Sequence, residues 1–389
     1  MMLRRILIAR HRGGRVTAVE EDGRIAELWA EAPESEVRVG DVYVARVTHV
    51  AKNLEAAFVD LSRGQNAFLP LRGGLPLRAE GDRGAREGDS VLVQVEREPH
   101  AGKPPSLSAA VSLAGELTVV SCPGAGVRYS RKIPEGEWKE FMRGYLPAQE
   151  GFGIIVRTEA PAADVSSVRM EADALRSRLE EIVSAAPHRP CYSVLRRGRG
   201  YMNAVCERWI SDPETAEVVI EEEEVFAEVT LAFPLSAHKC RLYRDDGLEM
   251  SKTYRFEKAF RDASDKRVWL KSGAYLVIEP TEAMTVIDIN TGKDDRKRSK
   301  DRTVRELASE AAREIAFQMR LRNLSGIVSA DFPDLPAQEA QEVLREMQDL
   351  LDRDPVRAEA VDFTRLGILE MTRRRIRRPF AEQMRWLDK

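Results

Sequence analysis

The sequence predicts an α+β protein built from several domains, and three observations support this fold class. The 389 residues are enough for two or more domains with sizeable cores. Residues 36–112 contain short strand-like runs separated by turns rich in glycine. From residue 264 onward, apolar runs of strand length alternate with amphipathic helical patterns. The pattern therefore changes along the chain, which indicates distinct modules.

The overall composition excludes several classes of protein. Charged residues make up 32% of the chain, but the net charge is only −3, so the total charge does not mark a nucleic-acid binder. The apolar run near the start is too short for a signal peptide, and no stretch of about 18 apolar residues predicts a membrane span. The four cysteines form no C-x-x-C pair, which favours a reducing, cytoplasmic setting without a disulfide framework.

The first half of the chain reads mainly as strands. Residues 3–30 alternate in a strand-like way, and EEDG at residues 20–23 predicts a hairpin turn. Four short runs between residues 36 and 112 indicate a small closed barrel of the OB type. Residues 113–203 predict a mixed region, with strands at ELTVVS and GFGIIVRT and a helix over residues 163–186. An irregular basic stretch, PHRPCYSVLRRGRGYMNAV, ends this region.

The last part of the chain predicts an α/β module. AYLVIEP, AMTVIDIN and GIVSADF are apolar runs of strand length. Residues 301–324 predict a helix, because apolar side chains recur every three or four positions, and residues 336–354 predict a second one. The apolar positions of the first helix are Val304, Leu307, Ala311, Ile315 and Met319.

Two aspartates at the ends of predicted strands are the first candidate site. Asp288 follows MTVI and Asp331 follows GIVSA, and strand ends in α/β sheets are where sites form. Two neighbouring carboxylates repel each other, and Mg²⁺ relieves that repulsion while keeping coordination positions for water and phosphate. Asn290 shares the strand face of Asp288 and could orient it. The alternative is that Asp288 and Asn290 only end a strand and begin a turn, because NTG is typical of turns.

Other candidates point to RNA. GKDDRKRSKDR at residues 292–302 and TRRRIRRP at residues 372–379 are basic segments that could hold phosphates, or could be solvated surface. Phe58 and Phe68 lie in the predicted barrel, where aromatic rings stack on unpaired bases, although a lone aromatic is more often a core residue. Arg157 and Thr158 follow a strand and suit a terminal phosphate, or Arg157 forms a surface ion pair.

Taken together, these segments resemble the catalytic half of the ribonuclease E/G family. GDVYVARVTHVAKNLEAAFVDLSRGQNAFLPL resembles the RNA-binding barrel of that family, and GFGIIVRT resembles its sensor of the RNA 5′ end. EAMTVIDINTG, EAAREIAFQMRLRNLSGIVSADFPDL and RLGILEMTRRR resemble its catalytic core and closing motif. The motifs follow in the family order from about residue 3 to residue 376.

The resemblance implies an architecture of named modules. An RNase H-like module would be interrupted by an OB-fold RNA-binding barrel and a 5′-sensor region, and a DNase I-like α/β catalytic module would follow. The implied boundaries in chain order are 1–35 and 204–263 for the two segments of the RNase H-like module, 36–112 for the barrel, 113–203 for the sensor and 264–389 for the catalytic module.

The resemblance also implies roles for particular residues. Asp288 and Asp331 would hold one Mg²⁺, with Asn290 supporting them in catalysis. The 5′-monophosphate would be bound by Arg157, Thr158, Gly115, Val119 and Arg131, and the RNA strand by Phe58, Phe68, Lys103 and Arg373.

The implied activity is a Mg²⁺-dependent endoribonuclease that acts on single-stranded RNA in rRNA maturation and mRNA turnover. A 5′-monophosphate would stimulate it, and the products would carry 5′-phosphate and 3′-hydroxyl ends. The C-P-x-C zinc pair of the family does not follow LEMTR, so any homodimer is expected without a zinc link. Two alternatives stay open from the sequence, namely a non-catalytic RNA-binding protein that retains the fold and a metal-dependent nuclease that acts on DNA.

Overall fold

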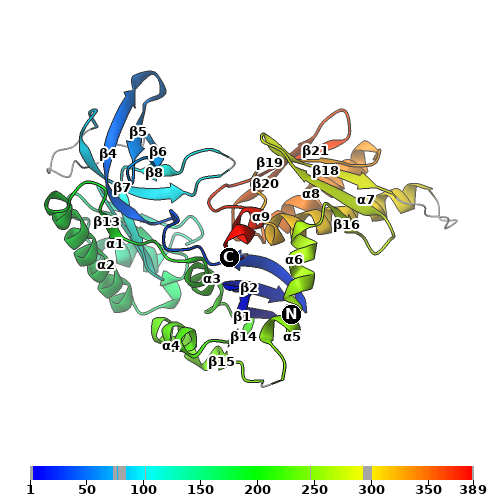
Figure 1. Cartoon of the computed structure of the whole chain (residues 1–389), viewed down its shortest axis with the longest axis horizontal. Coiled ribbons are helices and arrows are strands. Elements are labelled where there is room, and N and C mark those ends of the chain that lie inside the picture. The colour runs from blue at the N-terminus through cyan, green and yellow to red at the C-terminus, as the bar shows by residue number, and fades with distance from the viewer. Residues whose placement is uncertain are drawn as a thin grey trace. The chain divides into compact units, whose positions relative to one another are not determined.

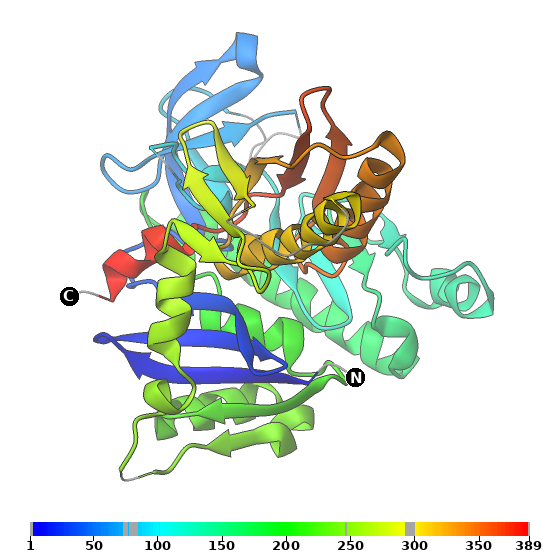
Figure 2. The same cartoon turned by 90° about the vertical axis from the view of Figure 1, so that its right-hand side faces the viewer.

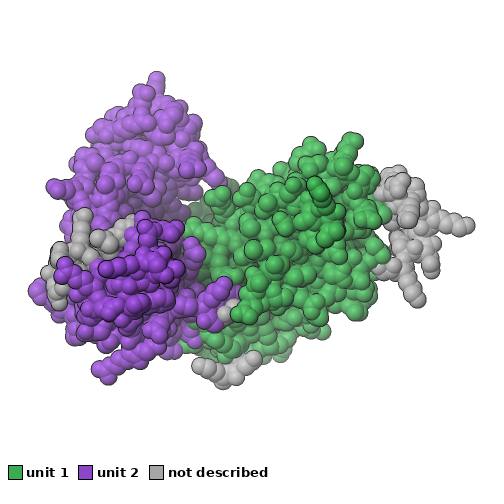
Figure 3. All heavy atoms as spheres, turned by 90° about the horizontal axis from the view of Figure 1, so that it is seen from above, with its two compact units in different colours: residues 1–33, 200–389 green, residues 34–199 purple. Residues whose placement is uncertain are grey.

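The computed structural model describes residues 3–72, 77, 85–100, 102–245, 247–291 and 300–387, with the backbone alone at residues 235 and 300–303. The chain divides into two compact units (Figure 1). Unit 1 contains residues 1–33 and 200–389, and unit 2 contains residues 34–199 (Figure 3). Unit 1 is therefore assembled from two segments separated by unit 2 in the sequence.

The first sheet of unit 1 has five strands in the order β15–β14–β1–β2–β3. β1 to β3 form an antiparallel meander, and β14 and β15 extend it in parallel. Asp22 and Gly23 make the expected hairpin turn with φ values of 49° and 79°. The strands are β1 (Arg4–His11), β2 (Gly14–Glu21), β3 (Arg24–Ala30), β14 (Thr215–Ile220) and β15 (Cys240–Leu242).

The centre of β1 is buried on both faces of this sheet. Ile6, Leu7, Ile8 and Ala9 are consecutive and at most 1% exposed, so helices must cover both sides of the strand. The segment EEEEVFAEV, rich in glutamate, begins a helix after β14. The helices of this part are α3 (Tyr201–Trp209), α4 (Glu223–Ala232), α5 (Met250–Thr253), α6 (Phe256–Ser264) and α9 (Phe380–Gln383).

The second sheet of unit 1 has six strands in the order β16–β17–β18–β19–β21–β20. Helices α7 (Lys300–Leu321) and α8 (Ala337–Leu351) pack on one face of it (Figure 2), where they share one apolar core with the sheet. The strands are β16 (Arg267–Trp269), β17 (Tyr275–Pro280), β18 (Met284–Asn290), β19 (Gly326–Asp331), β20 (Ala358–Phe363) and β21 (Ile368–Arg373).

Alternation of side chains explains which face of this sheet is covered. In β18, Thr285, Ile287 and Ile289 point into the core, whereas Val286 and Asp288 point outward and are exposed. Each buried aliphatic side chain of this kind contributes about 1.5–3 kcal/mol on leaving water. The opposite face of the sheet therefore carries the exposed side chains.

Unit 2 contains a closed five-stranded barrel, which confirms the barrel expected from the sequence. The strands run β4–β5–β6–β8–β7, and β7 pairs with β4 to close the ring, while β13 (Val194–Arg196) adds to the outside of β4. The short strand β8 was not expected, because SLS carries too few residues for a pattern. The barrel strands are β4 (Val42–Ala51), β5 (Ala56–Asp60), β6 (Asn66–Pro70), β7 (Ser90–Arg97) and β8 (Ser106–Ser108).

A four-stranded sheet in the order β11–β12–β10–β9 completes unit 2. The long helix α2 packs on β9 and β10, and Asp164 caps its N-terminus by accepting a hydrogen bond from the backbone N–H of Ser166. The elements are β9 (Val111–Ala114), β10 (Thr118–Cys122), β11 (Val127–Tyr129), β12 (Gly153–Val156), α1 (Glu137–Tyr145) and α2 (Val165–Ala185).

The observed architecture is thus a mixed α+β protein with a small closed barrel. Within the described ranges, every helix is too short or too polar to cross a lipid bilayer. Most of the basic segment at residues 292–302 lies outside the described residues.

Candidate active site

The candidate metal ligands lie on the two central strands of the six-stranded sheet. β18 and β19 pair in parallel, and Asp288 and Asp331 are direct partners in that register. Because side chains of paired residues point to the same side, both carboxylates stand on the exposed face, on backbones about 4.8 Å apart. The pairing of β18 and β19 therefore brings together two negatively charged side chains that are 43 positions apart in the sequence.

Asn290 belongs to the same group. It lies two residues after Asp288 on β18, and its Nδ2 donates a hydrogen bond to Oδ2 of Asp288 over 2.6 Å. This bond restricts the rotation of the carboxylate and fixes its direction on the open face. The amide thus orients one of the two aspartates.

Two exposed side chains on the face of the aspartates are apolar. Val286 and Ile327 precede them on the two strands and are 40% and 47% exposed. A substrate lying on this face would cover these side chains and remove water from the carboxylates, which strengthens electrostatic interactions. Asp288 and Asp331 therefore share a sheet face with two exposed apolar side chains that a bound substrate could cover.

The donor set fits magnesium better than zinc. Among the described residues no group of three or more His, Cys, Asp or Glu side chains could hold a metal. Structural zinc needs four protein ligands, and catalytic zinc three, whereas Mg²⁺ commonly takes one or two carboxylates and completes its shell with waters and substrate phosphate. A pair of carboxylates such as Asp288 and Asp331 is therefore a ligand set typical of Mg²⁺.

Unit 2 brings the candidate 5′-phosphate residues around one hairpin loop. Nη1 of Arg157 donates to the carbonyl of Gly115 over 2.5 Å, and the backbone N–H of Arg157 donates to Leu117. Oγ1 of Thr158 lies 2.9 Å from Oγ of Ser130, the residue before the exposed Arg131. Val119 lies on β10 and pairs with Ala114 at the base of the loop. The five candidates therefore lie on adjoining strands and loops.

Glu171 also belongs to this loop, although the sequence gave no reason to choose it. From α2, its carboxylate accepts hydrogen bonds from the backbone N–H groups of Glu116, Leu117 and Thr118 and from Oγ1 of Thr118, over 2.7–2.9 Å. A Cβ atom at Gly115 would lie 2.3 Å from Cδ of Glu171, so a side chain there would displace this carboxylate from its four donors. The loop conformation thus depends on a carboxylate far along the chain.

The barrel presents two aromatic rings on its surface. Phe58 and Phe68 are partners across β5 and β6, and their rings form an edge-to-face pair with centroids 5.9 Å apart. Both are half-buried and lie outside the barrel core, and His49 stacks on Phe58. Lys103 is exposed in a backbone bridge with His100. Partly exposed aromatic rings on a barrel surface suit stacking on unpaired bases.

A model of the ribonuclease E/G family matches residues 112–376 of this chain. The chain belongs to the ribonuclease E/G family. It is 30% identical to Ribonuclease G of Haemophilus influenzae over 92% of its own length and 77% of that protein.

Two relatives named Ribonuclease E are longer. The chain is 30% identical to that of Nostoc sp. and 31% identical to that of Escherichia coli, over 96% and 92% of its own length. It spans 56% of the first protein and 35% of the second. The likeness to the ribonuclease E members of the family therefore concerns only part of each of those proteins.

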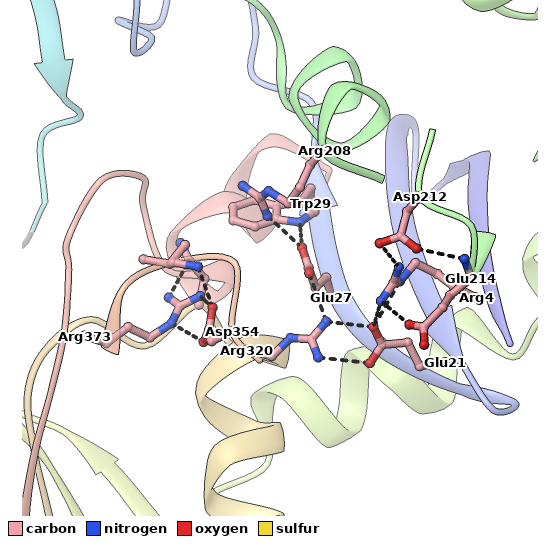
Figure 4. A network of polar contacts seen from close by, with 12 residues as sticks. Arg4, Glu21, Glu27, Trp29, Arg208, Asp212, Glu214, Arg320, Asp354 and Arg373 are labelled. Carbon is pink, nitrogen blue, oxygen red and sulfur yellow. Dashed lines mark hydrogen bonds and ion pairs between the residues drawn. The ribbon is translucent and has the colours of Figure 1, made fainter. Parts of the chain in front are cut away.

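Arg373, which the family resemblance places in contact with RNA, is not on the protein surface. The side chain of Arg373 is buried at the end of β21, where it makes a two-pronged ion pair with Asp354 at 2.7 and 3.2 Å (Figure 4). Its Nη1 also donates to Asn323 and to the carbonyl of Leu324. Arg373 is therefore fully engaged inside unit 1, and Arg378 of the same basic segment is likewise buried.

A second buried network joins α7 to the first sheet of unit 1. Arg320 of α7 donates to Glu21 and Glu27 over 2.9–3.1 Å, and Glu27 also accepts from Arg208 and from the indole of Trp29 (Figure 4). Burial alone would raise the pKa of Glu27, but the charges of Arg208 and Arg320 and the Trp29 hydrogen bond outweigh it and lower that pKa. The helix that packs on the six-stranded sheet is thus held by charge at its C-terminal end.

Proposed function

We propose that this protein is a Mg²⁺-dependent endoribonuclease that cleaves single-stranded RNA in RNA processing and decay, including rRNA maturation and mRNA turnover. The observation that carries the proposal is the in-register pair Asp288 and Asp331 on an exposed sheet face, with Asn290 bonded to the first. The relatives named Ribonuclease G and Ribonuclease E support the nuclease activity. The four described cysteines are free thiols, which fits a reducing, cytoplasmic location.

In the proposed reaction, different residues would bind the metal, orient a carboxylate and exclude water. Asp288 and Asp331 would hold one Mg²⁺, which when bound supplies an activated water and polarises the scissile phosphate. Asn290 keeps the carboxylate of Asp288 in one orientation. Val286 and Ile327 would lie under the substrate and exclude water from the carboxylates. In-line attack by water leaves a 5′-phosphate and a 3′-hydroxyl, and it requires no histidine.

Membership of the family also supports two RNA-binding roles for residues of unit 2. Phe58, Phe68 and Lys103 would hold an unpaired strand on the barrel at residues 36–112. Arg157, Thr158, Gly115, Val119 and Arg131, in the sensor region 113–203, would bind the 5′-monophosphate.

The modules of unit 1 keep the family names in this proposal. We assign residues 1–35 and 204–263 to an RNase H-like module and residues 264–389 to a DNase I-like module, although the end of the chain from α9 onward packs in the core of the first sheet.

The deciding experiment is cleavage of a fluorescent, A/U-rich, single-stranded oligoribonucleotide with a 5′-monophosphate in Mg²⁺. Asp288→Asn and Asp331→Asn should each abolish cleavage while leaving RNA affinity close to that of the native protein. Glu279→Gln removes an exposed carboxylate from the same sheet, paired with Lys266, and should leave the rate unchanged.

Three outcomes would contradict parts of the proposal. RNA binding without cleavage by the native protein would favour the non-catalytic reading, and equal cleavage of a matched DNA strand would remove the preference for RNA. Equal rates on 5′-phosphate and 5′-hydroxyl substrates would remove the sensor assignment but leave the nuclease intact.

A further inference from the structure

The face of the six-stranded sheet that carries Asp288 continues across β17 to the edge strand β16 (Figure 1). Asp288 is the register partner of Val277 on β17, and Val277 is the partner of Arg267 on β16. Because paired residues point to the same side of a sheet, Arg267 lies on the face of the aspartates, with its backbone about 10 Å from that of Asp288. The row of partners thus ends in an exposed positive charge.

A second row of register partners places two aromatic rings on the same face. Asn290 pairs with Tyr275 of β17, and Tyr275 pairs with Trp269 of β16. The two rings are in contact, with centroids 5.0 Å apart and planes tilted by 56°. Cζ of Arg267 lies 4.5 Å from the centre of the Tyr275 ring and 5.7 Å from that of Trp269. The three side chains therefore meet on the face that carries the candidate metal ligands.

Trp269 stays largely open to water in spite of these contacts. It is 63% exposed, whereas the other four tryptophans of the chain are buried or half-buried. A cross-strand aromatic pair stabilises a hairpin without needing an open ring face. An exposed indole beside a candidate active site is available to a ligand with a flat apolar surface.

The hairpin that carries the rings is fixed to α7. In the turn between β16 and β17, the backbone N–H of Ser272 donates to Oε1 of Glu310 on α7 over 3.2 Å. The N–H of Leu270 donates to the carbonyl of Ala274 over 2.8 Å, and Val268 and Leu270 are buried in the core shared with α7. The rings are therefore held in place before a ligand binds, which lowers the entropy cost of binding.

An unpaired nucleobase matches this arrangement. Bases stack on exposed aromatic rings, and an arginine beside the rings can bind a neighbouring phosphate. We propose that Trp269, Tyr275 and Arg267 form a stacking subsite for the nucleotide next to the phosphate held at Asp288 and Asp331. RNA as the ligand rests on the proposed function. The subsite would help to select the bond that is cleaved, because it fixes one base relative to the metal.

The test measures binding in EDTA, so it does not require cleavage. Fluorescence anisotropy gives the affinity of a labelled, A/U-rich, ten-nucleotide RNA and of a series in which one nucleotide at a time is abasic. Removing the base that stacks on Trp269 should weaken binding to the native protein on the order of tenfold. Trp269→Ala should weaken the intact RNA to a similar extent, and the same abasic position should then cost nothing more.

Two conservative comparisons separate stacking from folding. Trp269→Phe keeps an aromatic ring and should retain most of the abasic penalty at that position. Arg267→Ala should weaken every RNA of the series by about the same factor, because its partner is a phosphate, and should reduce the slope of log affinity against log salt by about 0.7.

A matched control removes an exposed ring from another part of the chain. Phe141 on α1 of unit 2 is 55% exposed and stacks on Tyr145, with centroids 5.4 Å apart. Phe141→Ala should leave the abasic penalty at the coupled position unchanged. Trp269→Ala should also bind Mn²⁺ as the native protein does, because Trp269 is not a metal ligand.

Incubation of the same intact RNA with Mg²⁺ then locates the subsite. The nucleotide coupled to Trp269 should be a neighbour of the cleaved bond. Coupling without any cleavage would remove the proposed nuclease but support the stacking subsite, so the two proposals fail separately.

Four results would overturn the proposal. The first is that Trp269→Ala behaves like Phe141→Ala, with every abasic penalty retained. The second is a coupled nucleotide far from the cleaved bond. The third is that Trp269→Ala converts a native dimer into monomers in sedimentation without changing RNA affinity, which would make the rings an interface between two copies. The fourth is that the native protein binds no RNA, which would also remove the proposed function.

Discussion

Replacing Glu27 by glutamine tests the buried charge network that holds α7 against the first sheet. Glu27 is 1% exposed and accepts hydrogen bonds from Arg320, Arg208 and Trp29 at 3.1–3.3 Å. Glutamine has nearly the same shape but no charge, so both arginines lose a counter-charge. Removing one partner of a buried ion pair costs about 3–5 kcal/mol. Because Arg320 keeps Glu21, we expect a loss near the lower end, about 3 kcal/mol.

Denaturant unfolding followed by tryptophan fluorescence measures this loss. Three of the five tryptophans, Trp29, Trp209 and Trp386, belong to the core of the first sheet, so the signal reports on the affected part. Glu223→Gln, which removes the exposed partner of Arg244, is the matched control and should stay within about 0.5 kcal/mol of the native protein.

The pH dependence of the free energy of unfolding tests the Glu27 network in a second, independent way. The network lowers the pKa of Glu27 below its unfolded value, so its contribution is present above the unfolded pKa of about 4.3. That contribution is lost as the pH falls through the lower folded value, because the carboxylate is then protonated in both states. The native protein and Glu27→Gln should therefore differ at pH 7 and converge in acid. A difference below 0.5 kcal/mol, or one that is constant from pH 7 to acid, would refute the argument.

Further predictions concern unit 2. Gly198→Ala places a Cβ atom 2.1 Å from the Val39 carbonyl oxygen and should lower stability in denaturant unfolding by about 1–3 kcal/mol, whereas Gly136→Ala, with open space around it, should be near neutral. Phe58→Ala and Phe68→Ala should each weaken single-stranded RNA binding in anisotropy titrations by about 1–3 kcal/mol. Glu171→Gln presents an NH₂ group to the loop N–H groups and should reduce the ratio of cleavage rates on 5′-phosphate and 5′-hydroxyl RNA; an unchanged ratio would contradict its positioning role.

Local patterns in the sequence predicted the main elements of the fold well. The helix at residues 301–324 was visible in its apolar spacing and is observed as α7, and the runs around Asp288 and Asp331 are observed as β18 and β19. These elements can be predicted from apolar spacing because one face of each is buried in a single core. The barrel was readable for a related reason, namely short alternating runs between turns.

Contacts between distant residues could not be read in the same way. Spacing alone does not reveal that Asp288 and Asp331 are register partners, since strand pairing is decided by the whole sheet. Glu171 reads as one charge on an amphipathic helix, and only the structure shows its four donors. Arg373 reads as part of a basic surface, but its partner Asp354 is 19 residues away, and the pair is buried.

The central claim is that Asp288 and Asp331 share one divalent ion. Titration of the protein with Mn²⁺, followed by electron paramagnetic resonance of the free ion, counts the bound ions directly. We expect one site in the native protein that is lost or much weakened in both Asp288→Asn and Asp331→Asn, and is retained in Glu279→Gln. Unchanged Mn²⁺ binding in either aspartate variant would contradict it.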